Sequence, residues 1–453
     1  MNKPWDYGVL KVSSNGRYLI NGTKPFFWMG DTAWLVFQKL TLEESFQYLK
    51  NRKEKGYTII LSDFIHSPEQ TNLNGDTPLV DQNFNEINTA GDYWEHIDKV
   101  VAMAEELGLY MGILPVWGSS MVKGGYLTTD NLETYMNFIL DRYKNYPNLV
   151  WIVGGDVRGN VNETVFNKTG EMMKAKNPDR LVGYHPFGRT SSSTWFHDKT
   201  WLDFNMFQSG HRRYDQASLG AWDDNAVTEE YFGEDNWRYV SKDYELNPPK
   251  PTIDGEPSYE EILQGLHDES QPYWKARDVR RYAYWAVFAG AFGHTYGHNS
   301  IMQFYRESEK KGAFGAKTFW QDALHHEGGA QMRHLSDLMN SVDFVNGHPA
   351  QELLLSGQGS RYDYNLVFAG AGYIFCYIYN GNAVTVDVTS FSGKTMDVYW
   401  YDPVCGTYSF IKEVTGQESL TAKPVTREDG SSDFVLVIKE IRDRCSLPCN
   451  CFT

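Results

Sequence analysis

Two short stretches of the chain carry an apolar run that ends in glycine and then in a carboxylate. LVWIVGGD (149–156) leads to Asp156, and PTIDGE (251–256) leads to Glu256. The glycines remove side-chain bulk beside each acid and tolerate irregular backbone at the end of a strand. Two carboxylates that face one another can divide the work of glycoside hydrolysis, because a protonated acid serves the departing oxygen while an ionised one meets the anomeric carbon. We therefore predict that Asp156 and Glu256 are the catalytic residues of one site.

Each acid also has an interpretation that involves no chemistry. Asp156 precedes VNETVFNKTG (161–170) and can be a turn residue or a helix cap. Glu256 can form a salt bridge to one of the arginines nearby. The matching position of the two acids, each at the end of an apolar strand, favours the catalytic interpretation.

The elements that must position these acids alternate apolar runs with amphipathic segments, which is the pattern of repeated βα units. Strands buried on both faces read as near-continuous apolar runs, as these do. The predicted strands span 26–31, 57–63, 110–117, 149–156, 181–187, 204–210, 251–256 and 289–297. The predicted helices span 42–56, 92–108, 130–145, 161–176, 225–243, 272–288 and 317–341. This order predicts the α/β class and a (β/α)8 TIM barrel.

In such a barrel the carboxyl ends of the strands meet at one mouth, and polar or aromatic residues follow every predicted strand. Histidine and glutamine can hydrogen-bond sugar hydroxyls, and tryptophan can stack on sugar faces. The residues that we expect to bind substrate are Asp31, Trp34, Trp117, His185, Trp195, Gln208, His211, His294 and Tyr296. The competing interpretation is that the histidines support loops and that the tryptophans belong to the core.

Three arginines lie in the loops that follow the fifth and sixth strands, namely Arg189, Arg212 and Arg213. A guanidinium group can hold a sugar carboxylate with two hydrogen bonds, so these arginines are candidates for recognising a uronic acid. Ordinary surface pairing is the alternative for each of them.

The sequence pattern changes near Val345, where short alternating strands separated by Gly, Asn and Asp turns begin. We predict a barrel domain over 1–344, an antiparallel β-sandwich over 345–443 that contributes no catalytic group, and a tail over 444–453. An N-terminal β-hairpin that turns at Ser14–Gly16 should cap the barrel floor. The strands expected in the sandwich span 363–368, 372–379, 383–389, 395–401, 407–411 and 433–440.

The amino-acid composition argues against some classes of binding partner. The 453 residues include 42 basic and 58 acidic side chains, a formal net charge of −16, which argues against nucleic acid or an anionic membrane. No apolar run approaches the ~18 residues of a membrane span. The five cysteines all follow residue 375, and Cys445, Cys449 and Cys451 crowd the tail, where a zinc knuckle or a terminal disulfide is the alternative to a loose segment. We expect no cofactor and no metal.

The first residues contain no apolar signal segment. We expect an exported protein, periplasmic or on the cell surface, whose leader is absent from this chain, and a cytoplasmic protein is the alternative. The pattern gives no indication of the oligomeric state.

Several motifs together resemble the apiosidase-like glycoside hydrolases. They are NGTKPFFWMGDTAW (21–34), WIVGGD (151–156), HPFGRTSSSTWFHDKTWLDFNMFQSGH (185–211) and PTIDGEPSYE (251–260). The resemblance covers nearly the whole chain and implies a (β/α)8 barrel followed by a small β-sandwich. It also implies action on plant pectin, chiefly on rhamnogalacturonan II side chains, with Asp156 as acid/base and Glu256 as nucleophile of a retaining mechanism. Many related barrel enzymes have Asn-Glu where this chain has Gly155-Asp156.

Two other classes of function are considered. A metal-dependent hydrolase would use histidines and carboxylates at the strand ends as ligands, but the sequence has no HExxH motif and no H-x-H after the first strand. A non-catalytic carbohydrate-binding or adhesion protein would work through the C-terminal sandwich. Two carboxylates placed for catalysis argue against that function.

Overall fold

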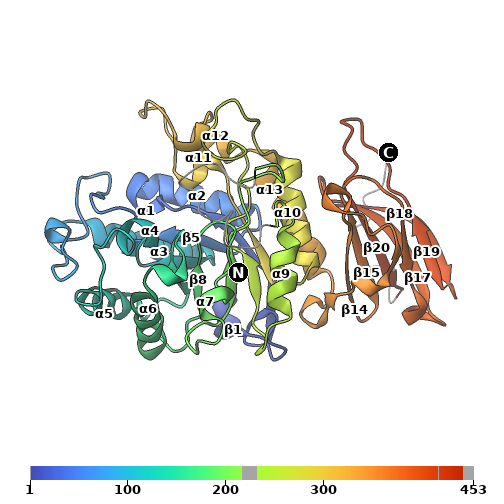
Figure 1. The fold of residues 1–453 in the computed structure, drawn as a ribbon, viewed down its shortest axis with the longest axis horizontal. Coiled ribbons are helices and arrows are strands. Elements are labelled where there is room, and N and C mark those ends of the chain that lie inside the picture. Colours follow the sequence, from blue (N-terminus) through green and yellow to red (C-terminus); the bar gives the residue numbers. More distant parts are fainter. Residues whose placement is uncertain (1, 217–231, 417, 442–453) are drawn as a thin grey trace.

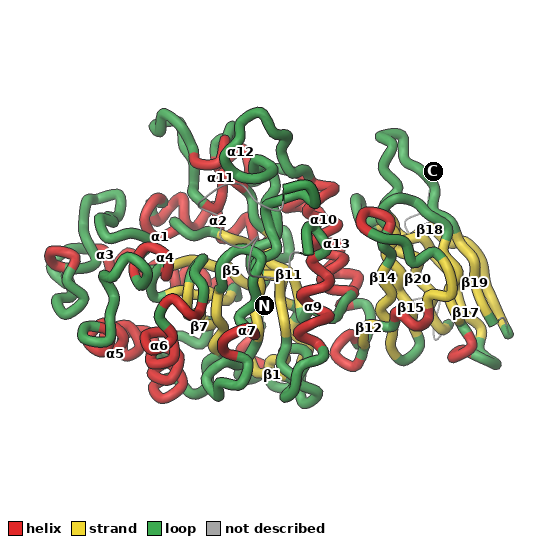
Figure 2. The backbone as a smooth tube through the Cα atoms, in the orientation of Figure 1, coloured by secondary structure: helices red, strands yellow, loops and turns green. Residues whose placement is uncertain are grey.

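The repeated βα pattern forms a ring of parallel strands enclosed by helices (Figures 1 and 2). A computed structural model describes residues 2–216, 232–416 and 418–441. The strands of the ring are β4 (Trp28–Thr32), β5 (Ile59–Asp63), β6 (Tyr110–Leu114), β7 (Leu149–Gly154), β8 (Val182–His185), β9 (Asn205–Phe207), β10 (Thr252–Asp254) and β11 (Gly293–Tyr296). Each of these strands overlaps the range predicted for it. The predicted alternation of parallel strands and helices, and with it the barrel, is confirmed.

The ring is built from two parallel sheets. One has six strands in the order β11-β4-β5-β6-β7-β8, and the other pairs β10 with β9. Hydrogen bonds outside these ladders join the sheets, from the Asp203 amide to the Val182 carbonyl (2.8 Å) and from the Phe292 amide to the Thr252 carbonyl (3.1 Å). Trp28 packs against Phe204 and Phe292, with ring centroids 5.8 and 5.7 Å away, so side chains from both sheets fill one interior.

The helices cover the outside of the ring, and most of them follow the predicted ranges. They are α1 (Val36–Lys39), α2 (Leu42–Glu54), α3 (Tyr93–Leu107), α4 (Gly118–Met121), α5 (Leu132–Tyr143), α6 (Glu163–Lys176), α7 (Ser193–Phe196), α9 (Asn236–Tyr244), α10 (Ala276–Phe288), α11 (Asn299–Met302), α12 (Trp320–Ala323) and α13 (Glu327–Asn340). The predicted helix 225–243 begins outside the described residues, and α9 represents its described part.

The single helix predicted over 317–341 is instead two helices, α12 and α13. The chain is extended at His326, with φ −64° and ψ 151°. The first amides of α13 donate to the Glu260 carboxylate, Gly328 at 3.1 Å and Gly329 at 3.3 Å. A buried acid thus caps a new helix N-terminus, which favours two helices over one continuous helix.

The N-terminal segment is a three-stranded antiparallel sheet where the sequence predicts a two-stranded hairpin. Its strands are β1 (Leu10–Val12), β2 (Leu19–Asn21) and β3 (Lys24–Phe26). Asn21 donates to the hydroxyl of Tyr110 (2.5 Å), and the Phe26 and Tyr110 rings meet edge to face. Because Tyr110 begins β6, this sheet lies at the end of the barrel opposite the carboxyl ends of the strands.

The C-terminal part is a pair of antiparallel sheets beside α10 and α13 (Figure 1). One sheet has the order β12-β14-β15-β20-β17-β18 and the other β13-β16-β19. The strands are β12 (His348–Pro349), β13 (Leu354–Ser356), β14 (Leu366–Gly370), β15 (Tyr373–Ile378), β16 (Val384–Asp387), β17 (Thr395–Asp402), β18 (Thr407–Thr415), β19 (Ser419–Ala422) and β20 (Phe434–Glu440). The sequence predicts most of these strands but misses the short β12, β13 and β19.

Two further expectations concern the C-terminal tail and a membrane span. Cys445, Cys449 and Cys451 of the predicted tail all lie there. Among the residues that are described, no helix combines the length and apolar character needed to cross a bilayer.

Candidate active site

Asp156 follows β7 through a backbone turn that glycine permits. Gly154 and Gly155 have φ values of 90° and 112°, and Asp156 itself has φ 45°. A Cβ on Gly155 would lie 2.8 Å from the Gly118 amide nitrogen, so a side chain there would be both strained and obstructed. Left-handed backbone at a non-glycine residue costs free energy and is concentrated at functional sites. The turn aims the Asp156 carboxyl group into a pocket at the mouth of the barrel.

The Asp156 carboxyl group is favoured in its protonated form. Burial, followed by the negative charge of Glu256, raises the pKa of Asp156 to about 6, although His185, His211 and a hydrogen bond from Gln208 act in the opposite direction. This value lies well above the usual range of an aspartic acid. Asp156 can therefore carry a proton at mildly acidic pH.

Glu256 follows β10 and is favoured in its ionised form. Burial alone would raise the pKa of Glu256, but hydrogen bonds from His185 and His211 outweigh it and lower the pKa to about 2. His211 Nε2 lies 3.0 Å from Glu256 Oε1, and His185 Nε2 lies 3.3 Å from Oε2. Both oxygens of Glu256 thus contact histidines, whereas the alternative interpretation from the sequence was a salt bridge to an arginine. The two acids have opposite preferred charge states within one site.

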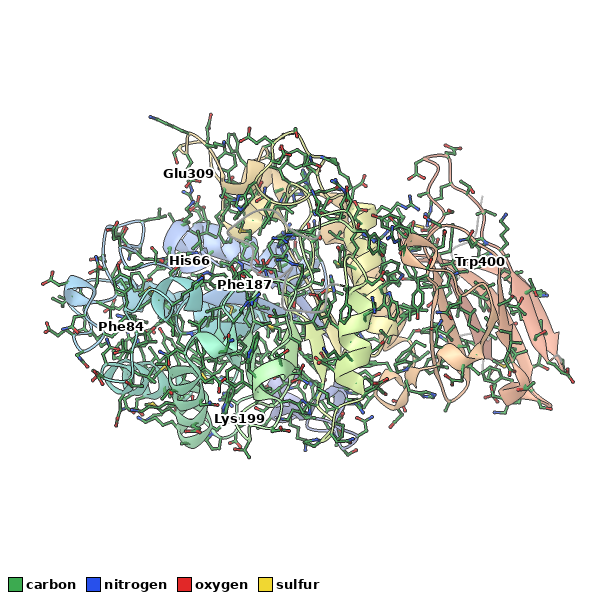
Figure 3. All side chains as sticks on the ribbon, viewed as in Figure 1. His66, Phe84, Phe187, Lys199, Glu309 and Trp400 are labelled. Carbon is green, nitrogen blue, oxygen red and sulfur yellow. The ribbon has the colours of Figure 1, made fainter. Side chains whose placement is uncertain are left out.

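A pocket of about 220 Å³ surrounds the two acids. Its walls come from the loops after the strands, and Figure 3 labels His66 and Phe187, which lie over the barrel. The lining residues are Trp34, His66, Trp117, Asp156, Phe187, Gly188, Arg189, Gln208, Gly210, His211, Arg212, Glu256, Tyr259, Ile262, Leu266, Met302 and Phe314. The pocket therefore brings together loops that are far apart in the sequence, from Trp34 to Phe314.

Aromatic rings form one wall of this pocket. His66 stacks on Trp117 with ring centroids 5.0 Å apart, and Trp117 lies 4.8 Å from Trp34. Behind them His185, with no exposed surface, meets Trp34 edge to face at 5.3 Å. Flat apolar faces beside polar ring edges are suited to the faces and hydroxyl groups of a sugar.

The structure brings most of the predicted site residues together. Trp34, Trp117, Asp156, Gln208, His211 and Glu256 line the pocket, and His185 lies directly behind Glu256. Arg189 and Arg212 also line it, whereas Arg213 pairs with Asp215 at 2.9 Å and is not among the lining residues.

Besides His185, four residues that we expected to bind substrate do not line this pocket. Asp31 is buried against Arg52 of α2, with 2.7 Å between its carboxylate and the guanidinium nitrogen. Tyr296 donates to Glu260 at 2.5 Å. His294 is fully buried on the same strand, and Trp195 on α7 packs against Gly159. Their contacts here are with the protein itself.

Several lining residues are absent from the predicted set of binding residues, notably His66, Phe187, Tyr259, Met302 and Phe314. His66 and Tyr259 each had a signal in the sequence, since each follows a strand-end carboxylate by three residues. Phe187, Met302 and Phe314 had no such signal, because their loops are shaped by contacts with distant parts of the chain.

The alternative interpretations of the site residues can also be compared with the structure. The side chain of Asn162, not that of Asp156, caps α6, accepting from the Val165 amide at 3.2 Å. Within residues 2–216, 232–416 and 418–441, no group of three or more His, Cys, Asp or Glu side chains is arranged to hold a metal ion.

Comparison with known proteins gives family matches to both parts of the chain. Residues 13–346 match the family described as "Apiosidase-like, catalytic domain". Residues 348–439 match the family described as "Putative collagen-binding domain of a collagenase". A search of curated proteins finds no significant match.

Two solved structures are similar over almost the entire chain. One, described as a glycoside hydrolase, is 40% identical with a TM-score of 0.91, and the alignment covers 98% of this chain and 99% of the other. The second, described as a glycoside hydrolase family 5 protein from Bacteroides vulgatus, is 37% identical with a TM-score of 0.91, covering 98% and 96%. The paired carboxylates, the barrel and these matches converge on one assignment: the chain belongs to the apiosidase-like family and is a glycosidase.

Proposed function

We propose that this glycosidase cleaves a glycosidic bond in the side chains of plant pectin, of the rhamnogalacturonan II type, with retention of anomeric configuration. The observation that carries the proposed mechanism is the pair of acids in one pocket with opposite charge preferences, Asp156 with a pKa of about 6 and Glu256 with a pKa of about 2. Retention requires this division between a proton donor and an ionised nucleophile.

In the first step, a Glu256 oxygen attacks the anomeric carbon while Asp156 gives its proton to the departing oxygen. The glycosyl ester that forms removes the negative charge from Glu256. Because that charge contributes to the raised pKa of Asp156, the pKa of Asp156 falls in the intermediate. Asp156 then takes a proton from water, which attacks the anomeric carbon and releases Glu256.

The pectin substrate is supported by the arginines of the pocket. Arg189 and Arg212 are 6% and 1% exposed and line the same pocket as the two acids, in a chain whose net charge is −16. A guanidinium group can hold a carboxylate with two hydrogen bonds, which suits a substrate that itself carries carboxylates, such as the uronic acids of pectin. We further propose that the protein is exported, because a cell-wall polysaccharide lies outside the cell.

The test is hydrolysis of a panel of defined oligosaccharides that contains rhamnogalacturonan II fragments, homogalacturonan fragments and neutral mannan and glucan fragments. Product mass identifies the bond that is cut, and NMR of the product as it forms gives its anomeric configuration. We expect cleavage of a rhamnogalacturonan II side chain and a first product of retained configuration. Cleavage of the neutral fragments alone would contradict the substrate class, and a first product of inverted configuration would contradict the mechanism.

A pair of variants links this activity to the pocket. Glu256→Gln should abolish turnover on every substrate, because an amide cannot form the glycosyl ester. Glu261→Gln is the matched control, since Glu261 is partly exposed and pairs with Lys275 at 2.6 Å outside the pocket. The control should keep the activity of the unmodified enzyme.

A further inference from the structure

Both oxygens of Glu256 face an imidazole nitrogen. His211 Nε2 lies 3.0 Å from Oε1, and His185 Nε2 lies 3.3 Å from Oε2. His185 Nε2 and Glu256 Oε2 are both buried, and within the described part of the chain neither has a hydrogen-bond partner of good geometry, so their 3.3 Å contact is longer and less well aligned than that of His211. Since a carboxylate oxygen accepts, the nitrogen that faces it must carry the proton.

The other ring nitrogen of each histidine faces a backbone amide. The Asp156 amide donates to His185 Nδ1 at 3.2 Å, and the Tyr259 amide donates to His211 Nδ1 at 3.4 Å. A backbone N–H can only donate, so each Nδ1 must present its lone pair. The hydrogen bond that one ring nitrogen makes thus determines whether the other nitrogen carries the proton.

Neighbouring side chains fix the orientation of both rings. Trp34 and Trp117 lie 5.3 and 5.7 Å from the His185 ring, and Tyr259 meets the His211 ring edge to face at 4.7 Å. His185 has no exposed surface and His211 is 3% exposed. Packing therefore holds both rings in place.

We infer that His185 and His211 are positioning residues, held as neutral Nε2–H tautomers, which present one N–H donor to each oxygen of Glu256. This inference rests on the proposed function of Glu256 as nucleophile. The donated N–H groups orient the carboxylate and favour its ionised form. Through the Asp156 amide, His185 also connects the backbone of the acid/base to the nucleophile.

The first test compares two substitutions at each histidine. Glutamine places its amide nitrogen near the position of Nε2 and keeps the donor, whereas asparagine reaches only the position of Nδ1 and loses it. A hydrogen bond to a charged group is typically worth ~1.5–3 kcal/mol, which corresponds to about ten- to a hundredfold in rate. His211→Asn and His185→Asn should lose kcat by this factor at little change in KM. His211→Gln and His185→Gln should keep kcat within about threefold.

The second test reads the tautomers in the unmodified enzyme and needs no substrate. Nitrogen NMR of protein labelled on its histidine rings distinguishes Nδ1 from Nε2, and the two glutamine variants assign the signals among the 12 histidines. We expect a protonated Nε2 and an unprotonated Nδ1 for both residues at neutral pH.

Equal losses in the asparagine and glutamine variants, an Nδ1–H tautomer or a doubly protonated ring would each overturn the inference. Undiminished activity of Glu256→Gln would instead overturn the proposed role of Glu256. The two failures are distinguishable because NMR reads the histidines whatever Glu256 does in the reaction.

Discussion

At the scale of the residue, the surroundings of Asp156 and Glu256 give two carboxyl groups of similar intrinsic acidity very different pKa values. Burial and the charge of Glu256 favour a proton on Asp156, while two imidazole N–H groups favour ionised Glu256. That the two acids share one pocket could be predicted from the sequence, because each ends an apolar strand beside glycine. Their protonation states could not, since those depend on His185 and His211 from other strands.

These protonation states predict the pH dependence of kcat/KM. The proposed reaction needs protonated Asp156, whose pKa is about 6, and ionised Glu256, whose pKa is about 2. Activity should therefore fall as the pH rises through about 6 and should also fall as the pH drops toward about 2. A pH profile on a substrate with a poor leaving group checks this. Activity that rises through the pKa of Asp156 would show that Asp156 acts first as a base.

Asp156→Asn separates the two roles of this residue. On an aryl glycoside with an acidic phenol, glycosylation needs no proton donor, so the loss should fall on deglycosylation, where the base is missing. Azide needs no base, and it should restore the rate and give a glycosyl azide of retained configuration. Product NMR reads the configuration. A glycosyl azide of inverted configuration from this variant would show that Asp156 is the nucleophile and Glu256 the acid/base.

At the scale of the element, strand register decides which residues reach the mouth. Paired residues on β4 and β11 include Trp28 with Gly293 and Asp31 with Tyr296. Side chains alternate between the two faces of a strand, so Trp28 points into the barrel while Asp31 and Tyr296 point toward the helices. The sequence predicts that these strands exist, but their near-continuous apolar character hides which face each residue occupies.

Asp31→Asn tests the outward orientation of this residue. Asp31 and Arg52 are 0% and 1% exposed, and removal of one charge leaves the other buried without its partner. Breaking such a pair costs about 3–5 kcal/mol, so the free energy of unfolding should fall by that amount while kcat/KM of the folded enzyme stays unchanged. Urea denaturation and steady-state kinetics measure the two effects. A loss confined to kcat/KM would instead indicate that Asp31 binds substrate, as the sequence predicts.

The loops that complete the pocket depend on contacts that no local pattern encodes. Asp156 adopts a left-handed backbone that is rare for an aspartate, and the turn is held by the end of β8, where the His185 carbonyl accepts from Gly155 at 3.0 Å. Trp195 shows the opposite case, because its aromatic character suggested sugar stacking. Its short helix instead places it against Gly159 on the outside of the barrel.

At the scale of the whole molecule, the C-terminal domain supports the barrel from the side. Phe288 of α10 packs near Phe368 and Phe375, each with ring centroids 6.2 Å away. Arg280 donates to both oxygens of Asp433, at 2.9 and 3.1 Å. Trp400, labelled in Figure 3, lies in this domain, far from His66 and Phe187. Among the described residues, the pocket has no lining residue beyond Phe314.

Asp433→Asn should therefore weaken the association of the domains without affecting catalysis. Arg280 and Asp433 are 4% and 0% exposed at their side chains, so the unpaired guanidinium would cost about 3–5 kcal/mol. We expect a lower melting temperature and faster proteolysis between the domains, with unchanged kcat/KM. Lys394→Gln, which breaks the exposed pair with Glu440, is the control and should change neither. A fall in kcat/KM for Asp433→Asn would indicate that the C-terminal domain takes part in the reaction.

The division of the barrel into two sheets has a consequence for how activity is acquired during folding. Asp156 follows β7 and His185 ends β8, both in the six-stranded sheet, whereas Gln208, His211 and Glu256 follow β9 and β10 of the smaller sheet. Neither sheet alone holds both of the proposed catalytic acids, and the contact between His185 and Glu256 crosses the boundary between the sheets. During refolding, the larger sheet can form without producing an enzyme. We therefore expect activity to return only once the two sheets have joined.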